Sequence, residues 1–154
     1  MLRKKNGYPE PSLFKPKNPQ KYKGNPNNIW CRSNLELRFY LWLDTHVNVL
    51  EWGSEEIVIP YISPKDNRPH RYFPDAWAKM QTKTGIQTYL VEIKPYSQTH
   101  LPRPQKRQTR KYLTEVMTFA INDAKWKSAQ AFCQDKGWKW KVITEKELYG
   151  TKTK

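Results

Sequence analysis

Two acids and a lysine, on nearby stretches of the sequence, are residue types whose chemistry fits the hydrolysis of phosphodiesters. Asp75 follows a proline in Tyr-Phe-Pro-Asp, and Glu92 and Lys94 stand one residue apart in Val-Glu-Ile-Lys. The segment between Asp75 and Glu92 is long enough for a strand, a turn and a returning strand. Because side chains alternate along a strand, Glu92 and Lys94 share one face, and Asp75 can lie opposite Glu92 on an antiparallel neighbour.

A pair of carboxylates beside a cation on an apolar strand is costly unless it binds a metal or forms an ion pair. The residues alone leave both interpretations open. Mg²⁺ prefers oxygen ligands, keeps several waters and needs few carboxylates, and we expect Mn²⁺ to substitute for it. Such an ion activates water against a phosphodiester and offsets charge on the phosphate. Lys94 would orient or deprotonate the water, or stabilise the pentacovalent phosphorus.

Hydrophobic periodicity and turn residues predict the elements that position these side chains. A capping box at 33–36 predicts a helix over 33–45. Three strands are predicted over 49–61, with an irregularity at Gly53-Ser54, over 70–80 and over 88–94. The later elements are a helix, a strand and a capped terminal turn, at 107–136, 138–143 and 144–147. The order α-β-β-β-α-β predicts an α/β fold with a mixed sheet flanked by helices.

Residues 1–28 contain five prolines among lysines, asparagines and glutamines. Proline lacks an N–H and fixes φ, so we expect an extended basic arm without regular elements. Residues 29–154 are expected to form a single domain. The aromatic residues of the arm, Tyr8, Phe14 and Tyr22, suit either packing on the domain or stacking near nucleic acid.

The charge distribution indicates a polyanionic partner, most simply DNA. The chain of 154 residues has 28 Lys and Arg against 14 Asp and Glu, a net charge of +14. Basic surplus is concentrated in residues 1–35 and 94–112, whereas residues 36–93 are slightly acidic. Acids inside a cationic frame suggest a metal held against phosphate. The alternative is a solvated basic surface.

Other classes of protein are disfavoured by composition. No apolar run approaches the roughly 20 residues of a membrane span, and the N-terminus lacks the apolar stretch of a secretory signal. Cys31 and Cys133 are too few for a disulfide scaffold or a self-contained zinc site. We interpret them as free thiols in a reducing cytoplasm.

Pro74-Asp75 followed by Glu92-Ile93-Lys94 resembles the PD-(D/E)xK nuclease superfamily, and the element order matches the core of that restriction-endonuclease-like fold. Nearly the whole chain is similar to the head completion nucleases of T-even-type tailed bacteriophages. The stretches that carry this similarity are 15–24, 32–39, 52–57, 70–75, 91–95, 124–126 and 143–148.

The resemblance implies Mg²⁺-dependent cleavage of DNA late in virion assembly, when a filled head is made competent to join a tail. It implies phage head or neck proteins as partners, and a location in the virion and the host cytoplasm. By position, Asp75 and Glu92 would be metal ligands, the Ile93 carbonyl a third ligand, and Lys94 the catalytic lysine. Glu36 matches an acid that many superfamily members place on the first helix, where it would ligate or orient a metal. Its place in the capping box is an alternative explanation.

Further basic residues are candidates for contacts with phosphate, near the mouth of the site. They are Arg103, Lys106, Arg107, Arg110 and Lys111 after the third strand, and His70 and Arg71 before Asp75. For His70, an ordinary half-exposed strand position is the alternative. Glu55 and Glu56 are either further acids of the site or exposed edge charges. No base-reading motif is present, which predicts low sequence specificity.

Two other functions remain open at this point. One is a basic assembly protein that binds DNA or the head vertex, with its acids only structural. The other is a junction-resolving or repair nuclease on the same fold.

Overall fold

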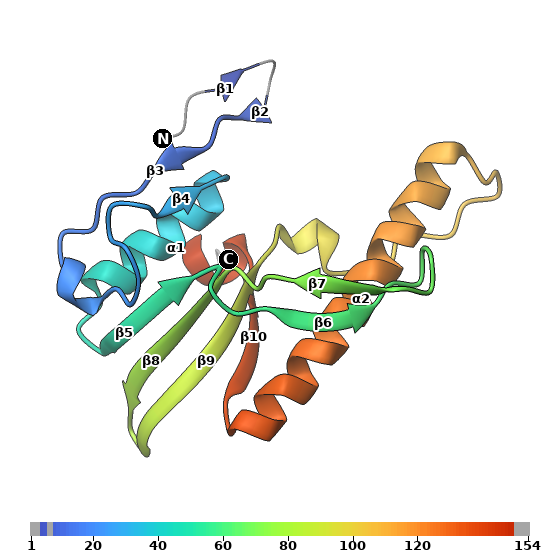
Figure 1. Ribbon diagram of the computed structural model, residues 1–154. Coiled ribbons are helices and arrows are strands. Elements are labelled where there is room, and N and C mark those ends of the chain that lie inside the picture. Colours follow the sequence, from blue (N-terminus) through green and yellow to red (C-terminus); the bar gives the residue numbers. More distant parts are fainter. Residues whose placement is uncertain (1–3, 6–7, 150–154) are drawn as a thin grey trace, which may run out of the picture.

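The computed structural model describes residues 4–5 and 8–149. A four-stranded sheet lies between two layers (Figure 1). One layer contains α1 (Asn34–Thr45) and α3 (Glu145–Tyr149), and the other contains α2 (Arg110–Lys136) and a two-stranded ribbon. Within the described residues, no helix combines the length and apolarity needed to cross a membrane.

The sheet has the order β10-β9-β8-β5 and is mixed. Its strands are β5 (Val49–Ser54), β8 (Ala76–Thr82), β9 (Gly85–Ile93) and β10 (Lys139–Ile143). β8 pairs antiparallel with β5 and β9, and β10 pairs parallel with β9. The predicted order of core elements and the mixed sheet are therefore confirmed.

Two of the predicted strands are each divided. The prediction of one strand over 49–61 with an irregularity at Gly53-Ser54, and that of one strand over 70–80, are wrong. β5 ends at Ser54, and β6 (Ile59–Ile62) follows as a separate strand. The second predicted strand becomes β7 (Pro69–Tyr72) and β8. β6 and β7 pair with each other as a ribbon over α2. The breaks occur at Glu55, whose φ is +52°, and at the buried Pro74, which has no N–H for a strand ladder.

Other boundaries shift for local reasons. Helix α2 begins at Arg110 rather than 107, because Thr109 caps it by accepting a hydrogen bond from the Tyr112 N–H. The connection between the strands predicted over 70–80 and 88–94 is a tight turn, since β8 continues to Thr82 and β9 begins at Gly85. Gly137 ends α2 in the left-handed conformation, as a C-terminal glycine does.

The N-terminal arm is more regular than expected. It forms β1 (Lys4–Lys5), β2 (Tyr8–Pro9), β3 (Ser12–Leu13) and a 3-10 turn, η1 (Pro19–Lys21), while β4 (Trp30–Cys31) pairs with β3. Two-residue strands fit between the prolines, so the expectation of no regular element is wrong. Phe14 and Tyr22 are buried, which favours packing on the domain over stacking on nucleic acid. The side chain of Tyr8 lies outside the described residues.

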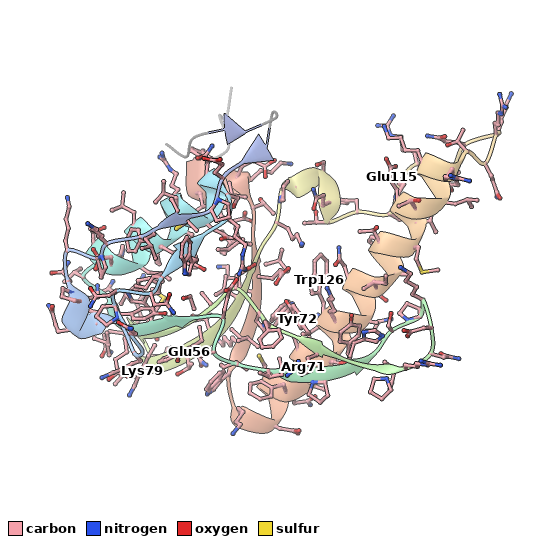
Figure 2. The ribbon with its side chains drawn as sticks, turned by 45° about the horizontal axis from the view of Figure 1, so that its top comes forward. Glu56, Arg71, Tyr72, Lys79, Glu115 and Trp126 are labelled. Atoms are coloured by element: carbon pink, nitrogen blue, oxygen red, sulfur yellow. The ribbon has the colours of Figure 1, made fainter. Side chains whose placement is uncertain are left out.

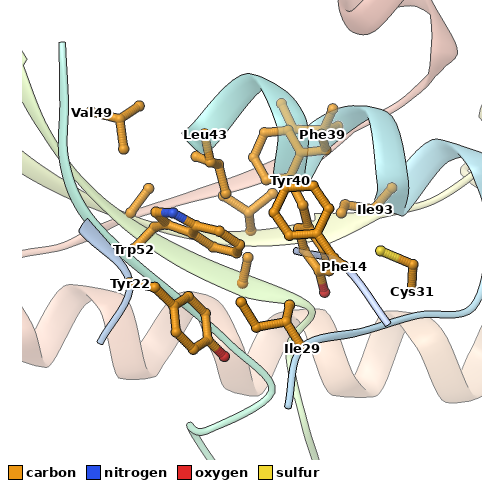
Figure 3. Packing of buried hydrophobic residues seen from close by; sticks show 14 residues of the cluster. Phe14, Tyr22, Ile29, Cys31, Phe39, Tyr40, Leu43, Val49, Trp52 and Ile93 are labelled. Carbon is orange, nitrogen blue, oxygen red and sulfur yellow. The ribbon is translucent and has the colours of Figure 1, made fainter. Parts of the chain in front are cut away.

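Two clusters of buried residues lie on opposite faces of the sheet. The first, between the sheet and α1, is centred on the fully buried Trp52, around which Phe14, Tyr22 and Tyr40 gather (Figure 3). The second lies under α2 and the β6–β7 ribbon. Its buried members are Ile59, Tyr61, Tyr72, Leu90, Ala129 and Cys133. Both cysteines are free and buried, one in each cluster, as a reduced chain predicts.

Candidate active site

Asp75 stands at the corner between β7 and β8, and three hydrogen bonds fix it there. Its carbonyl accepts from the Tyr40 hydroxyl at 3.2 Å and from the Glu55 N–H at 3.3 Å. Its carboxylate Oδ2 accepts from the Ile93 N–H at 2.7 Å. The residue is thus held by α1, by the end of β5 and by β9, so its carboxylate has little freedom to move.

Glu92 faces Asp75 across the β8–β9 pair. The ladder ends at Ala76 opposite Val91, and its next position places Asp75 opposite Glu92, as the sequence predicts. The Glu92 side chain is only 7% exposed. Its Oε2 accepts a hydrogen bond from the Tyr72 hydroxyl of β7, and its Oε1 lies 3.6 Å from Lys94 Nζ. Glu92 and Lys94 share the face of the sheet that α2 covers.

The two carboxylates repel each other in this setting. Burial raises the pKa of Asp75 well above its ordinary value of 3.8, the charge of Glu92 raises it further, and the Ile93 N–H opposes both. Burial, and then the charge of Glu92, also raises the pKa of Tyr72. The Tyr72 hydroxyl therefore remains a donor at neutral pH, while the carboxylate pair would gain most from a nearby cation.

The donor atoms at this corner fit Mg²⁺. The N–H and C=O of a strand residue point the same way, so the Ile93 carbonyl points toward the Asp75 side, as its N–H does. Extending the antiparallel register places Pro74 opposite Ile93, and proline has no N–H to donate to that carbonyl. Among the described residues, no three His, Cys, Asp or Glu side chains are grouped to hold a metal. Two carboxylates and a carbonyl, with waters completing the shell, are a set that Mg²⁺ accepts.

Glu36 takes part in capping α1 at Ser33 as the sequence predicts, although its carboxylate bonds to the N–H of Arg32, one residue before the N-cap. Its N–H donates to Ser33 Oγ at 3.1 Å, and its Oε2 accepts from the Arg32 N–H at 2.8 Å. Burial raises the pKa of Glu36, the Arg32 N–H opposes this, and the charges of Glu55 and Glu92 add to the rise. Glu36 is thus near enough to interact electrostatically with Glu55 and Glu92, although it does not line the cavity described next.

A cavity of about 560 Å³ opens over the acid pair. Its charged lining residues are Arg32, Glu55, Arg71, Asp75, Glu92, Lys94 and Lys125, and the aromatic ones are Tyr72 and Phe73. Figure 2 shows Tyr72 on β7 and Trp126 on α2 in the space between the ribbon and the helix. Four cations surround three acids, so the cavity can hold a phosphate whose ester bond lies over the carboxylates.

The sequence did not assign several of the lining residues to the site. For Glu55 it allowed two roles, an acid of the site or an exposed edge charge. The structure places Glu55 half-buried in the cavity wall, paired with the Arg32 guanidinium. Lys125 carries no local signal, since a lysine on a long helix is ordinarily a solvated surface residue. Tyr72 sits three residues before Asp75, and its aromatic character indicated only packing.

The predicted phosphate-binding residues are divided in space. Arg71 lines the cavity, whereas His70 pairs with Asp66 at 2.8 Å on the exposed ribbon. The other five, Arg103, Lys106, Arg107, Arg110 and Lys111, do not line it. Arg110 lies about 22 Å from Lys125 along α2, at 1.5 Å per residue. Figure 2 shows this end of the helix, marked by Glu115, far from Trp126. Arg110 therefore lies beyond the expected mouth, and contact of the five basic residues with DNA stays a prediction.

Comparison with known proteins agrees with this geometry. Residues 46–145 match the family described as TnsA-like endonuclease N terminal, a range that includes Asp75, Glu92 and Lys94 but not Glu36. The chain is 39% identical over 137 residues to the head completion nuclease of Enterobacteria phage T4, covering 86% of this chain and 89% of that protein. The fold is accordingly restriction-endonuclease-like. The chain belongs to the family with a TnsA-like endonuclease N-terminal domain and is a relative of the phage head completion nuclease.

Proposed function

We propose that this protein is a Mg²⁺-dependent deoxyribonuclease that hydrolyses phosphodiester bonds with little sequence specificity. The observation that carries the proposal is the facing pair Asp75 and Glu92 beside Lys94, at the base of a cavity with a surplus of cations. A structural ion pair explains these residues less well, because Lys94 lies 3.6 Å from Glu92 while, among the described residues, no cation lies within 4.0 Å of the Asp75 carboxylate.

The residues of the site divide the proposed reaction between them. Asp75, Glu92 and the Ile93 carbonyl would hold the ion, which when bound polarises the phosphate and makes water a better nucleophile. The Tyr72 hydroxyl and the Ile93 N–H fix the two carboxylates by hydrogen bonds, so little reorganisation is needed when substrate arrives. Lys94 places its ammonium over the same cavity, where it can orient the water or stabilise charge on the phosphate.

We place this activity in head completion, before a filled head joins its tail. The name of the T4 relative supports this role, and its similarity covers most of both chains. The role requires DNA as substrate and head or neck proteins as partners, in the virion and the host cytoplasm. The basic arm and the basic residues of 103–111 would contact the DNA backbone, which carries no sequence information.

The test is cleavage of linear and closed circular duplex DNA with Mg²⁺, with Mn²⁺ and with a chelator. The variants are Asp75→Asn and Glu92→Gln, and the matched control is Asp135→Asn, which alters an exposed acid on the last turn of α2. The wild type and Asp135→Asn should cut only with metal, and the two site variants should bind DNA without cutting.

Two results would overturn the proposal. Binding without cleavage by the wild type under every metal condition would favour the assembly protein. A strong preference for branched over linear DNA in direct competition would favour the junction-resolving nuclease.

A further inference from the structure

Helix α2 brings a second lysine to the cavity, outside the sequence motif. Lys125 lines the cavity together with Asp75, Glu92 and Lys94. Lys94 directly follows β9 on the floor of the cavity, whereas Lys125 lies on the helix that covers this face of the sheet. The two ammonium groups thus reach one cavity from two different elements.

The ammonium group of Lys125 contacts aromatic rings and, among the described residues, forms no ion pair. Its Nζ lies 5.6 Å from the ring centroid of Tyr72 and 5.8 Å from that of Tyr61, within the range of cation–π attraction. In the part of the chain that the structure describes, its Nζ has no carboxylate within 4.0 Å. The aromatic rings therefore support the side chain without neutralising it.

A lysine two residues further along α2 shows the contrast. Lys127 forms an ion pair with Asp123 at 2.9 Å, and its side chain is 74% exposed. Lys125 is partly buried instead. Burial and then the charge of Lys94 lower its pKa, whereas the charges of Glu92 and Asp75 raise it. Two cations close enough to repel each other beside an open cavity would both be stabilised by an anion between them.

We propose that Lys125 is a catalytic residue that binds a non-bridging oxygen of the scissile phosphate, which is then held between Lys125 on α2 and Lys94 on β9. The inference deepens the proposed function and rests on it. The lysine acts as a point charge that offsets the negative charge gained by the phosphate in the transition state. It neither gives nor takes a proton: the oxygen of water forms a new P–O bond, the P–O bond to one sugar oxygen breaks, and that oxygen leaves as a hydroxyl after taking a proton from solvent.

The first experiment measures single-turnover cleavage of linear duplex DNA at saturating Mg²⁺. Lys125→Gln should cleave about 100-fold more slowly, the scale of losing one donor to a transition-state charge. Lys125→Arg should recover part of the rate, because it keeps the charge. Lys127→Gln, the matched control on the same helix, should stay within about twofold of the wild type because its ammonium already pairs with Asp123.

The second experiment needs no metal and no cleavage, so it separates this inference from the proposed function. Binding of a short fluorescent duplex is measured against salt concentration in a chelator. Lys125→Gln should make the log–log slope shallower by about 0.9, the value for one phosphate contact, and Lys127→Gln should leave it unchanged. Both measurements are made below the thermal midpoint of each variant, so a loss of stability does not mimic the effect.

An unchanged slope together with a cleavage rate within about twofold of the wild type would overturn the inference. If the wild type fails to cleave while Lys125→Gln still changes the slope, the proposed function fails and the phosphate contact stands.

Discussion

The two faces of the sheet contribute differently to the candidate active site. The layer on the α1 face is an aromatic cluster around Trp52, and it supplies the Tyr40 hydroxyl that holds the main chain of Asp75. The layer on the α2 face is smaller, and there buried apolar residues border Glu92, Lys94 and Lys125. One face therefore positions the site, and the other contributes most of its charges.

Strand β9 serves both layers through alternate residues. Val91 and Ile93 belong to the cluster on the α1 face, whereas Leu90 belongs to the cluster on the α2 face. Glu92 stands between Val91 and Ile93 in the sequence, but its side chain lies on the α2 face, in the cavity. Neighbouring substitutions on this strand should therefore separate stability from cleavage.

The largest expected effect comes from comparing Glu92→Gln with Val91→Ala. Glu92→Gln should reduce cleavage by about 10³-fold, because it removes a carboxylate that would hold the metal ion. Its free energy of unfolding should not fall, because the change removes the charge that repels the Asp75 carboxylate. Val91→Ala should lower the free energy of unfolding by about 2 kcal/mol through lost packing, with normal cleavage per folded molecule. Urea unfolding and single-turnover cleavage measure both, and equal effects of the two variants on cleavage would contradict the division between the faces.

The two tyrosines that reach the acids give a finer comparison. Tyr72→Phe leaves Glu92 without its donor and should cost about 1.5–3 kcal/mol, the range for hydrogen bonds to charged groups. Tyr40→Phe removes a donor to the Asp75 carbonyl and should cost about 0.5–1.5 kcal/mol, the neutral range. Urea unfolding measures both losses. A larger loss for Tyr40→Phe would mean that the α1 face holds the site more strongly than its hydrogen bond indicates.

The acid pair predicts a dependence of stability on pH. The pKa of Asp75 is 3.8 in an ordinary setting and is raised in the folded state by burial and by Glu92. At pH values between the ordinary pKa and the raised pKa of the folded state, the folded protein binds more protons than the unfolded chain. The Asp75 carboxyl therefore lowers the free energy of unfolding as pH rises. In a chelator, Glu92→Gln should gain thermal stability over the wild type as pH increases through that window. A difference in thermal midpoint that shrinks with rising pH would contradict this, and Mg²⁺ should stabilise only the wild type.

The smallest expected effect concerns the distant basic residues. Replacing Arg107, Arg110 and Lys111 together should make the salt dependence of duplex binding shallower by roughly two or more, at about 0.9 per phosphate contact. Cleavage at saturating DNA should stay near the wild-type rate, since none of the three lines the cavity. An unchanged slope would place the DNA away from this end of α2.

Local residue patterns predicted the acid pair, because strand alternation and a tight return fix which side chains face each other. They did not predict where the strands break. Gly53 indicated an irregularity, yet β5 continues through it, and a Cβ there would come within 2.4 Å of Trp77 Nε1. The break falls instead at Glu55, a residue type that gives no warning of a positive φ. Lys125 could not be predicted as part of the site, since only the packing of α2 against the ribbon brings it there.

The parallel pairing of β9 with β10 has a consequence for synthesis of the chain. Residues 94–138, which include all of α2, separate the two strands, so their pairing closes a long loop. During translation, Asp75 and Glu92 emerge from the ribosome before Lys125 and β10. The nascent chain can form the β8–β9 hairpin early, but its cavity lacks one wall until α2 has emerged and docked. We expect cleavage to begin only after release of residue 143, which keeps an unfinished nuclease inactive during translation.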